Sequence, residues 1–170
     1  MDGAPRGGGA DRAALIELRR VIDVAAAPEV VWRRLWDVPA LARCIPGCEG
    51  VETVEAERRY RATISDRVGP FRIAIPLDVR VESTPPTRLS LTAAGRDSAL
   101  GSPVTVALEV SLAPAGAGGT RLTLAGHGDV GGKLAALGQG VIDRKTREIL
   151  DRLAGNLAGL FVDGADAAAV

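Results

Sequence analysis

The chain has 170 residues, 46% of them hydrophobic, which is enough for one domain with a buried core and short for two. Its 21 Lys and Arg residues balance its 21 Asp and Glu residues, so no overall positive charge favours nucleic acid. Local arginine pairs such as Arg33-Arg34 are interpreted as solvated surface. No run approaches the roughly 18 consecutive apolar residues that a membrane-spanning helix needs.

The two ends of the chain differ in composition from its middle. Residues 1–14 are rich in Gly, Ala, Asp and Arg and hold no apolar signal-peptide segment, so we expect a disordered arm and a cytoplasmic protein. Residues 162–170 are small, and we expect a flexible tail there. The folded domain is therefore predicted to span residues 15–161.

A strand and two short helices are expected at the start of this domain. Residues 15–24 mix apolar and charged side chains, as a half-buried strand does. Pro28 suits the first turn of a helix over 28–37, and residues 39–43 predict a second short helical turn. Pro46-Gly47 then ends the helical region, because proline lacks an amide hydrogen and glycine accepts positive φ.

From Gly50 to Val130 the apolar residues recur with a period of two, which indicates half-buried antiparallel strands. Pro76 interrupts this pattern and predicts a sheet edge or a bulge at that point. The positions expected to face inward are Tyr60, Ala62 and Ile64; Phe71, Ile73, Ile75, Leu77, Val79 and Val81; Leu89, Leu91 and Ala93; Val104, Val106, Leu108, Val110 and Leu112; and Leu122 and Leu124.

A long amphipathic helix is predicted over residues 131–161, where apolar residues recur every three or four positions. At about 1.5 Å per residue it would be roughly 45 Å long and would need a broad apolar surface to pack against. The sequence therefore predicts an α+β helix-grip arrangement. In it, a curved antiparallel sheet of about seven strands surrounds one long carboxy-terminal helix, and two short helices follow the first strand.

No catalytic residue is predicted. His127 and Asp129 share a polar face, and such a pair can perform acid-base chemistry, but no activated serine or cysteine motif accompanies them. We interpret His127 as a surface residue. The run Gly131-Gly132-Lys133 lacks the upstream glycine and the following Ser or Thr of a phosphate-binding loop, so the glycines are expected to bend the last strand into the helix.

Two cysteines, Cys44 and Cys48, lie on either side of Pro46-Gly47. With His127 as the one histidine, they cannot supply the four ligands of a structural zinc site, so we predict neither metal nor cofactor. We interpret them as buried or half-buried thiols, with a redox pair or reactive thiol as the alternative.

The space between sheet and helix is the feature that bears on function. Aromatic residues make up 3% of the chain, so few large side chains are present to fill it, and either an open apolar pocket or an ordinary packed core is consistent with the composition. The residues predicted to line a pocket are Leu41, Ile45, Leu77, Val79, Leu91, Val106, Leu108, Leu124, Leu137, Val141 and Ile149.

Three segments resemble a known family. Residues 40–49 (Ala-Leu-Ala-Arg-Cys-Ile-Pro-Gly-Cys-Glu), 68–70 (Val-Gly-Pro) and 130–138 (Val-Gly-Gly-Lys-Leu-Ala-Ala-Leu-Gly) are similar to the family of the carbon monoxide dehydrogenase G protein. This family belongs to the START-like (SRPBCC) superfamily of polyketide cyclases and lipid-transport proteins. The resemblance covers residues 15–161 and implies a helix-grip fold with a central cavity for an apolar ligand.

The resemblance also implies a partner. Members of the family are accessory proteins of aerobic, molybdenum-containing carbon monoxide dehydrogenases and related hydroxylases, and do not themselves oxidise the substrate. Some relatives continue through a linker into a hydrophobic membrane segment, whereas this chain ends at Val170 without one. We therefore expect any membrane contact, at the inner face, to be peripheral.

Three hypotheses follow. The first is a carrier of an apolar ligand, an isoprenoid quinone or a lipid, that serves a molybdenum hydroxylase. The second is an assembly factor without a ligand, which docks the hydroxylase through the loop residues Cys44, Pro46, Gly47, Cys48 and Glu49. The third and least favoured is an aromatase or cyclase that shapes a polyketide, because no acid-base pair occupies an inward position.

Overall fold

The computed structural model describes residues 13–169, and the side chains of these residues up to Val162. Seven antiparallel strands form one sheet in the order β1-β7-β6-β5-β4-β3-β2. The predicted arm, residues 1–14, lies mostly outside the described residues. The elements are β1 (Ala14–Val24), α1 (Pro28–Leu35), α2 (Val38–Cys44), β2 (Cys48–Glu55), β3 (Arg59–Val68), β4 (Phe71–Thr84), β5 (Arg88–Arg96), β6 (Pro103–Ala115), β7 (Gly119–Val130), α3 (Gly132–Ala135) and α4 (Gln139–Ala169).

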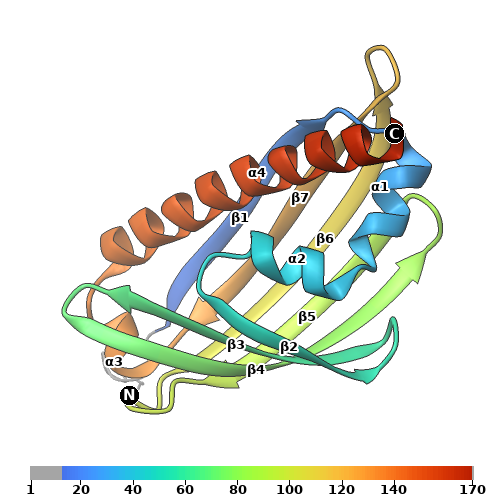
Figure 1. The fold of residues 1–170 in the computed structure, drawn as a ribbon. Coiled ribbons are helices and arrows are strands. Elements are labelled where there is room, and N and C mark those ends of the chain that lie inside the picture. Colours follow the sequence, from blue (N-terminus) through green and yellow to red (C-terminus); the bar gives the residue numbers. More distant parts are fainter. Residues whose placement is uncertain (1–12, 170) are drawn as a thin grey trace, which may run out of the picture.

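The long helix α4 lies across the concave face of the sheet, beside the edge strand β1 (Figure 1). Two contacts fix it there: the Gln139 carboxamide bonds the backbone of Leu15, and Arg20 forms an ion pair with Asp151. Helices α1 and α2 connect β1 to β2, the two outer strands of the sheet (Figure 1). The predicted α+β helix-grip architecture is confirmed.

Three glycines mark where the sheet bends. Gly95, Gly126 and Gly128 lie at inward positions of the central strands β5 and β7. A Cβ atom on Gly126 or Gly128 would collide with the backbone carbonyl oxygens of Ala107 or Thr105 on β6, and one on Gly95 would collide with the Pro76 carbonyl. The backbone can approach its neighbour this closely only without a side chain, so the curvature of the sheet depends on these glycines.

Pro76 lies where β4 changes its number of partners. Before it, β4 pairs with β3 alone, and the pairing with β5 begins at Leu77. A residue without an amide hydrogen is tolerated at this point because the missing donor interrupts no ladder on the β5 side. The sheet edge predicted from Pro76 is therefore present, in the first half of a strand that is central in its second half.

The helix predicted to run unbroken over 131–161 is in fact two helices. Gly138 has a φ of +102°, a conformation that an α-helix cannot contain, and it separates α3 from α4. The prediction was wrong here because apolar spacing alone does not register a single turn of reversed φ. At the other end α4 continues to Ala169 through residues expected to form a flexible tail, and the alanines of this stretch have the highest helix propensity.

The glycine pair before α3 has a structural role. Gly131 packs against the ring of Pro103, and Gly132 has a φ of +62°. The amide of Leu134 donates a hydrogen bond of 3.1 Å to Ser102 Oγ, so the turn from β7 into α3 is tied to the start of β6.

Candidate ligand-binding cavity

Two hydrophobic clusters lie between α4 and the sheet, one at each end. The cluster near α3 contains Leu134 and Ile142, packed against the start of β4 and the end of β7. The cluster at the other end contains Leu122 and Phe161 and is covered by α1, α2 and the carboxy-terminal half of α4. Only this second cluster surrounds a cavity among the described residues.

The cavity has a volume of about 220 Å³. Its lining comes from three layers: the helices α1 and α2, the concave face of the sheet, and two residues one turn apart on α4. The lining residues are Leu35, Trp36, Val38, Leu41, Ala42 and Ile45; Val51, Tyr60, Ala62, Val79, Val81, Leu89, Leu91, Leu108, Val110, Leu122 and Leu124; and Leu153 and Leu157.

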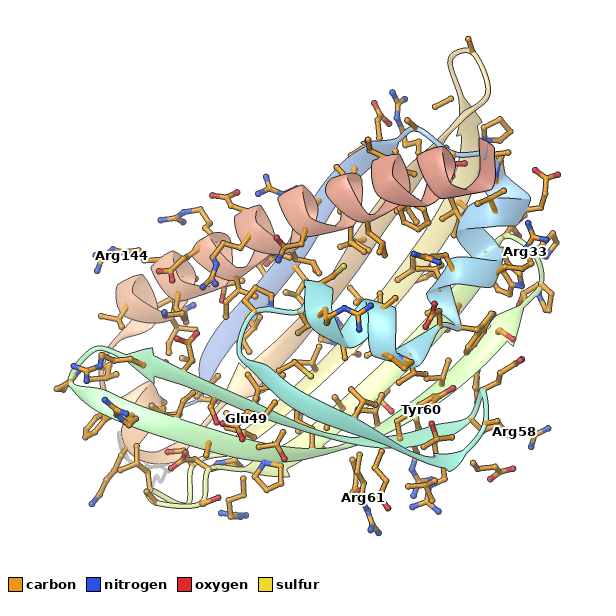
Figure 2. The ribbon with its side chains drawn as sticks, in the orientation of Figure 1. Arg33, Glu49, Arg58, Tyr60, Arg61 and Arg144 are labelled. Carbon is orange, nitrogen blue, oxygen red and sulfur yellow. The ribbon has the colours of Figure 1, made fainter. Side chains whose placement is uncertain are left out.

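The cavity presents almost no polar atoms. Tyr60 carries the single side-chain polar atom of its lining, and the phenol oxygen accepts a hydrogen bond of 2.7 Å from the Glu57 amide in the turn before β3. The next residue, Arg61, points to the outer side of the sheet, as Figure 2 shows. With its one hydroxyl bonded to the turn, the cavity selects a molecule by shape and apolarity and offers no directional contact.

The wall formed by α1 and α2 is held by few contacts. Trp32 and Trp36 on α1 pack edge to face with ring centroids 5.8 Å apart, and Trp36 lines the cavity. Asp37 caps α2 by accepting from the Ala40 amide at 3.3 Å. The Asn156 Nδ2 atom on α4 donates to the Cys44 carbonyl oxygen at 2.9 Å, which connects α2 to α4.

The predicted cavity residues divide between the two ends of the fold. The following line the cavity: Leu41, Ile45, Val79, Leu91, Leu108 and Leu124. The others do not, because they lie on the same faces but nearer to α3 or at the middle of α4. Leu77, Leu137 and Val141 pack against the filled cluster, and neither Val106 nor Ile149 reaches the cavity.

Several lining residues were missed although the sequence indicated them. Val81, Leu89, Val110 and Leu122 have the same inward parity as the residues that were chosen. Leu35, Trp36, Val38 and Ala42 carried no such signal, because a short helix between two strands does not reveal from its sequence which face it turns inward.

The loop predicted to dock a partner is largely internal. Cys44 and Pro46 are buried, Cys48 is half-buried, and only Gly47 and Glu49 are exposed. Gly47 has a φ of +79° and its carbonyl accepts a bond of 2.8 Å from the Ser65 amide, so this loop is fixed to β3. Both cysteines are free thiols, and burial raises the pKa of the Cys44 thiol above its usual value.

The residues considered for catalysis or metal binding lie away from the cavity. His127 and Asp129 are exposed on the outer side of β7. Among the described residues no group of three or more His, Cys, Asp or Glu side chains is placed to hold a metal ion.

Residues 21–159 match the family model for CoxG, the G protein of carbon monoxide dehydrogenase. The chain belongs to the CoxG family. Every residue that lines the cavity falls within the matched segment, from Leu35 on α1 to Leu157 on α4.

Solved structures show that the CoxG-family chain has a START-like fold. A conserved protein from Geobacillus kaustophilus superposes with a TM-score of 0.75 at 22% identity, covering 85% of this chain and 94% of that one. A START superfamily protein from Mycobacterium smegmatis gives a TM-score of 0.62 at 18% identity, covering 87% of this chain and 98% of that one. The Zhui aromatase/cyclase from Streptomyces sp. R1128 gives a TM-score of 0.60 at 16% identity, covering 89% and 94%.

Two further findings add no assignment. No curated protein matches the CoxG-family chain. In the part of the chain that the structure describes, no helix combines the length and the apolarity needed to cross a membrane.

Proposed function

We propose that this CoxG-family protein binds the apolar part of a lipid-like molecule in the cavity under α1 and α2. The observation that carries the proposal is a cavity of about 220 Å³ lined throughout by apolar side chains and closed by two short helices. An empty apolar cavity forfeits dispersion contacts, and filling it with an apolar group regains them. The family match and the START-like fold support the same interpretation.

The size of the cavity restricts the ligand. A protein cavity of about 150 Å³ holds a molecule the size of benzene. A volume of about 220 Å³ therefore accommodates one substituted ring or a short aliphatic segment, and not a complete polyisoprenoid chain. An isoprenoid quinone, the ligand we would test first, would place its ring or a few isoprene carbons inside and the remainder outside.

Binding without chemistry is the role that the lining supports. Tyr60 is the one titratable residue of the lining, and its oxygen is engaged by the Glu57 amide. General acid-base catalysis needs a group within hydrogen-bond reach of the bound molecule. We infer that the protein carries its ligand for a carbon monoxide dehydrogenase or a related molybdenum hydroxylase, at most touching the membrane peripherally, and is not itself an enzyme.

Trp36 provides a direct measurement of occupancy. The chain has two tryptophans, so Trp32→Phe leaves Trp36 as the single reporter in the cavity wall. Titration with a short-tailed benzoquinone is expected to quench this fluorescence to saturation. A straight-chain fatty acid serves as the second probe, and binding of both probes alike would show that the cavity recognises apolarity and not the quinone ring.

A matched pair of substitutions locates the site. Ala62→Phe places a ring in the cavity, whereas Ala94→Phe places the same ring on the exposed outer face of β5. We expect Ala62→Phe to weaken quinone binding about tenfold or more and Ala94→Phe to leave it unchanged. Equal binding by both folded variants would refute the cavity as the site.

The same variants separate ligand binding from partner binding. If the hydroxylase co-purifies with the wild type and equally with Ala62→Phe, docking does not require an occupied cavity. Loss of co-purification with Glu49→Lys would then assign the contact to the exposed end of the residue 44–49 loop.

A further inference from the structure

The edge of the sheet at β1 is built to accept another strand. β1 pairs only with β7, in a register that continues without a shift from Ala14 to Val24. Gln139 bonds both the amide and the carbonyl of Leu15, at 2.8 and 2.6 Å, so these backbone groups point to the free edge. Since alternate residues of a strand point the same way, the backbone groups of Arg19, Val21 and Asp23 also face this edge.

Beyond Gln139 the edge is left open. Within the described residues, no side chain donates to or accepts from the backbone of residues 19–23 on this edge. Helix α4 covers the edge near Leu15 and then crosses the concave face toward α1 (Figure 1). The stretch around Val21 therefore presents unpaired backbone groups, the arrangement that recruits another strand.

The side chains of this stretch are exposed and apolar at the centre. Val21 is 55% exposed, which only Leu15, at 61%, exceeds among the large hydrophobic residues of the described chain. Arg19 and Asp23, two positions before and after Val21, carry opposite charges on the same outer face. A cation and an anion placed symmetrically about an apolar residue form a pattern that complements itself when a second copy runs antiparallel.

We propose that two copies of this chain pair through β1, antiparallel about a twofold axis at Val21. Val21 then faces Val21 of the second copy, and Arg19 faces Asp23 of the second copy on both sides. The three opposed pairs would exchange about six backbone hydrogen bonds. Asp23 already accepts from Arg121 at 2.9 and 3.2 Å, so each carboxylate would lie between two guanidinium groups.

Another register is excluded by Gln139. Centring the pair on Leu18 would oppose Glu17 to Arg19 and Leu15 to Val21, which is also complementary in charge and apolarity. That register needs the backbone groups of Leu15, which Gln139 occupies. The Val21-centred register uses only the open part of the edge.

The opposite edge of the sheet shows the features that prevent pairing. β2 has register shifts at Cys48/Gly50 and at Thr53/Glu55, and it carries Glu49, Glu52 and Glu55. Bulges disrupt the regular spacing of edge groups, and like charges repel a second copy. β1 has neither protection, which distinguishes it as the pairing edge.

The test compares one substitution on each edge. Val21→Lys would set two ammonium groups opposite each other at the twofold axis, whereas Val54→Lys places the same group on β2, where Val54 is 43% exposed. By sedimentation velocity we expect the wild type and Val54→Lys to dimerise and Val21→Lys to do so about tenfold more weakly or not at all. Arg19→Glu, which faces Asp23 of the second copy, is expected to weaken the dimer as well.

Cross-linking tests the register. In a Cys48→Ser background, Val21→Cys is expected to form a covalent dimer with a short bis-maleimide, because residue 21 meets itself, and Val54→Cys is expected not to. A wild type that stays monomeric at all concentrations, or a Val21→Lys variant as dimeric as the wild type, would overturn the proposal. A dimer that Val21→Cys fails to cross-link would overturn it equally.

Discussion

The two ends of the space between α4 and the sheet are built from the same kinds of residue, yet one is filled and the other holds a cavity. At the filled end Leu134 of α3 and Ile142 of α4 are buried among strand residues. At the cavity end Leu91 and Leu153 remain only half-buried because they face the cavity. Residue type does not decide between the two outcomes; the element that covers the sheet does.

The covering elements differ in how they are anchored. At the filled end the turn between β5 and β6 is fixed by the buried Asp97 carboxylate, which accepts from the amides of Ala74 at 2.8 Å and Ala99 at 3.0 Å. Ser102, at the end of this turn, holds α3 through the Leu134 amide. At the cavity end α2 is joined to α4 chiefly through Asn156. A densely bonded cover is drawn down onto the sheet, whereas a sparsely bonded one leaves space beneath it.

The largest effect is expected at the bend that separates the two ends. Gly126→Ala places a Cβ against the Ala107 carbonyl of the neighbouring strand, so the backbone of two central strands must move apart. We expect a loss of about 3 kcal/mol or more in the free energy of unfolding, measured by urea denaturation. Gly155→Ala on α4 is the control, because its Cβ meets no atom and alanine favours helix, and it is expected to stabilise by about 0.5 kcal/mol.

The same truncation should have different costs at the two ends. Leu134→Ala removes a fully packed side chain and is expected to cost about 3 kcal/mol. Leu91→Ala enlarges a cavity that already exists and removes a side chain that is only half-buried, so we expect about 1 kcal/mol. Equal losses in urea denaturation would mean that the cavity end is packed as tightly as the other.

An ion pair connects α4 to the opposite wall. Lys145 Nζ lies 3.4 Å from Asp66 Oδ1 on β3, and their side chains are 19% and 20% exposed. Lys145→Met leaves the Asp66 carboxylate poorly solvated, so we expect a loss of about 1 kcal/mol. Arg61→Met, which removes the partner of Asp78 from an exposed pair, is expected to change stability by less than about 0.5 kcal/mol, and a larger loss there than at Lys145 would contradict the role of burial.

How much of this was available from the sequence follows from the same contrast. Alternation identified the inward face of every central strand, because period two and burial are directly coupled. It did not identify where along a strand the cavity lies, so Leu77 and Val106 were chosen with Leu91 and Leu108. That position depends on where α1 and α2 settle, which follows from contacts such as Asn156 with Cys44, far apart in the sequence.

The smallest effect concerns the mobility of the cavity cover. The Cys44 thiol is buried beside α4 with a raised pKa, whereas Cys48 is half-buried, so we expect Cys48 to react with maleimide about tenfold faster at neutral pH. Asn156→Ala removes the side-chain bond to the Cys44 carbonyl. It is expected to raise the Cys44 rate while leaving the Cys48 rate unchanged.

The two rates, measured by mass spectrometry of the labelled protein, report opposite sides of the same loop. If only Cys44 accelerates in Asn156→Ala, α2 is the mobile cover, and the same variant should take up the quinone probe faster. If both thiols accelerate together, the whole loop opens from β3, and the path to the cavity runs past Gly47 instead of under α2.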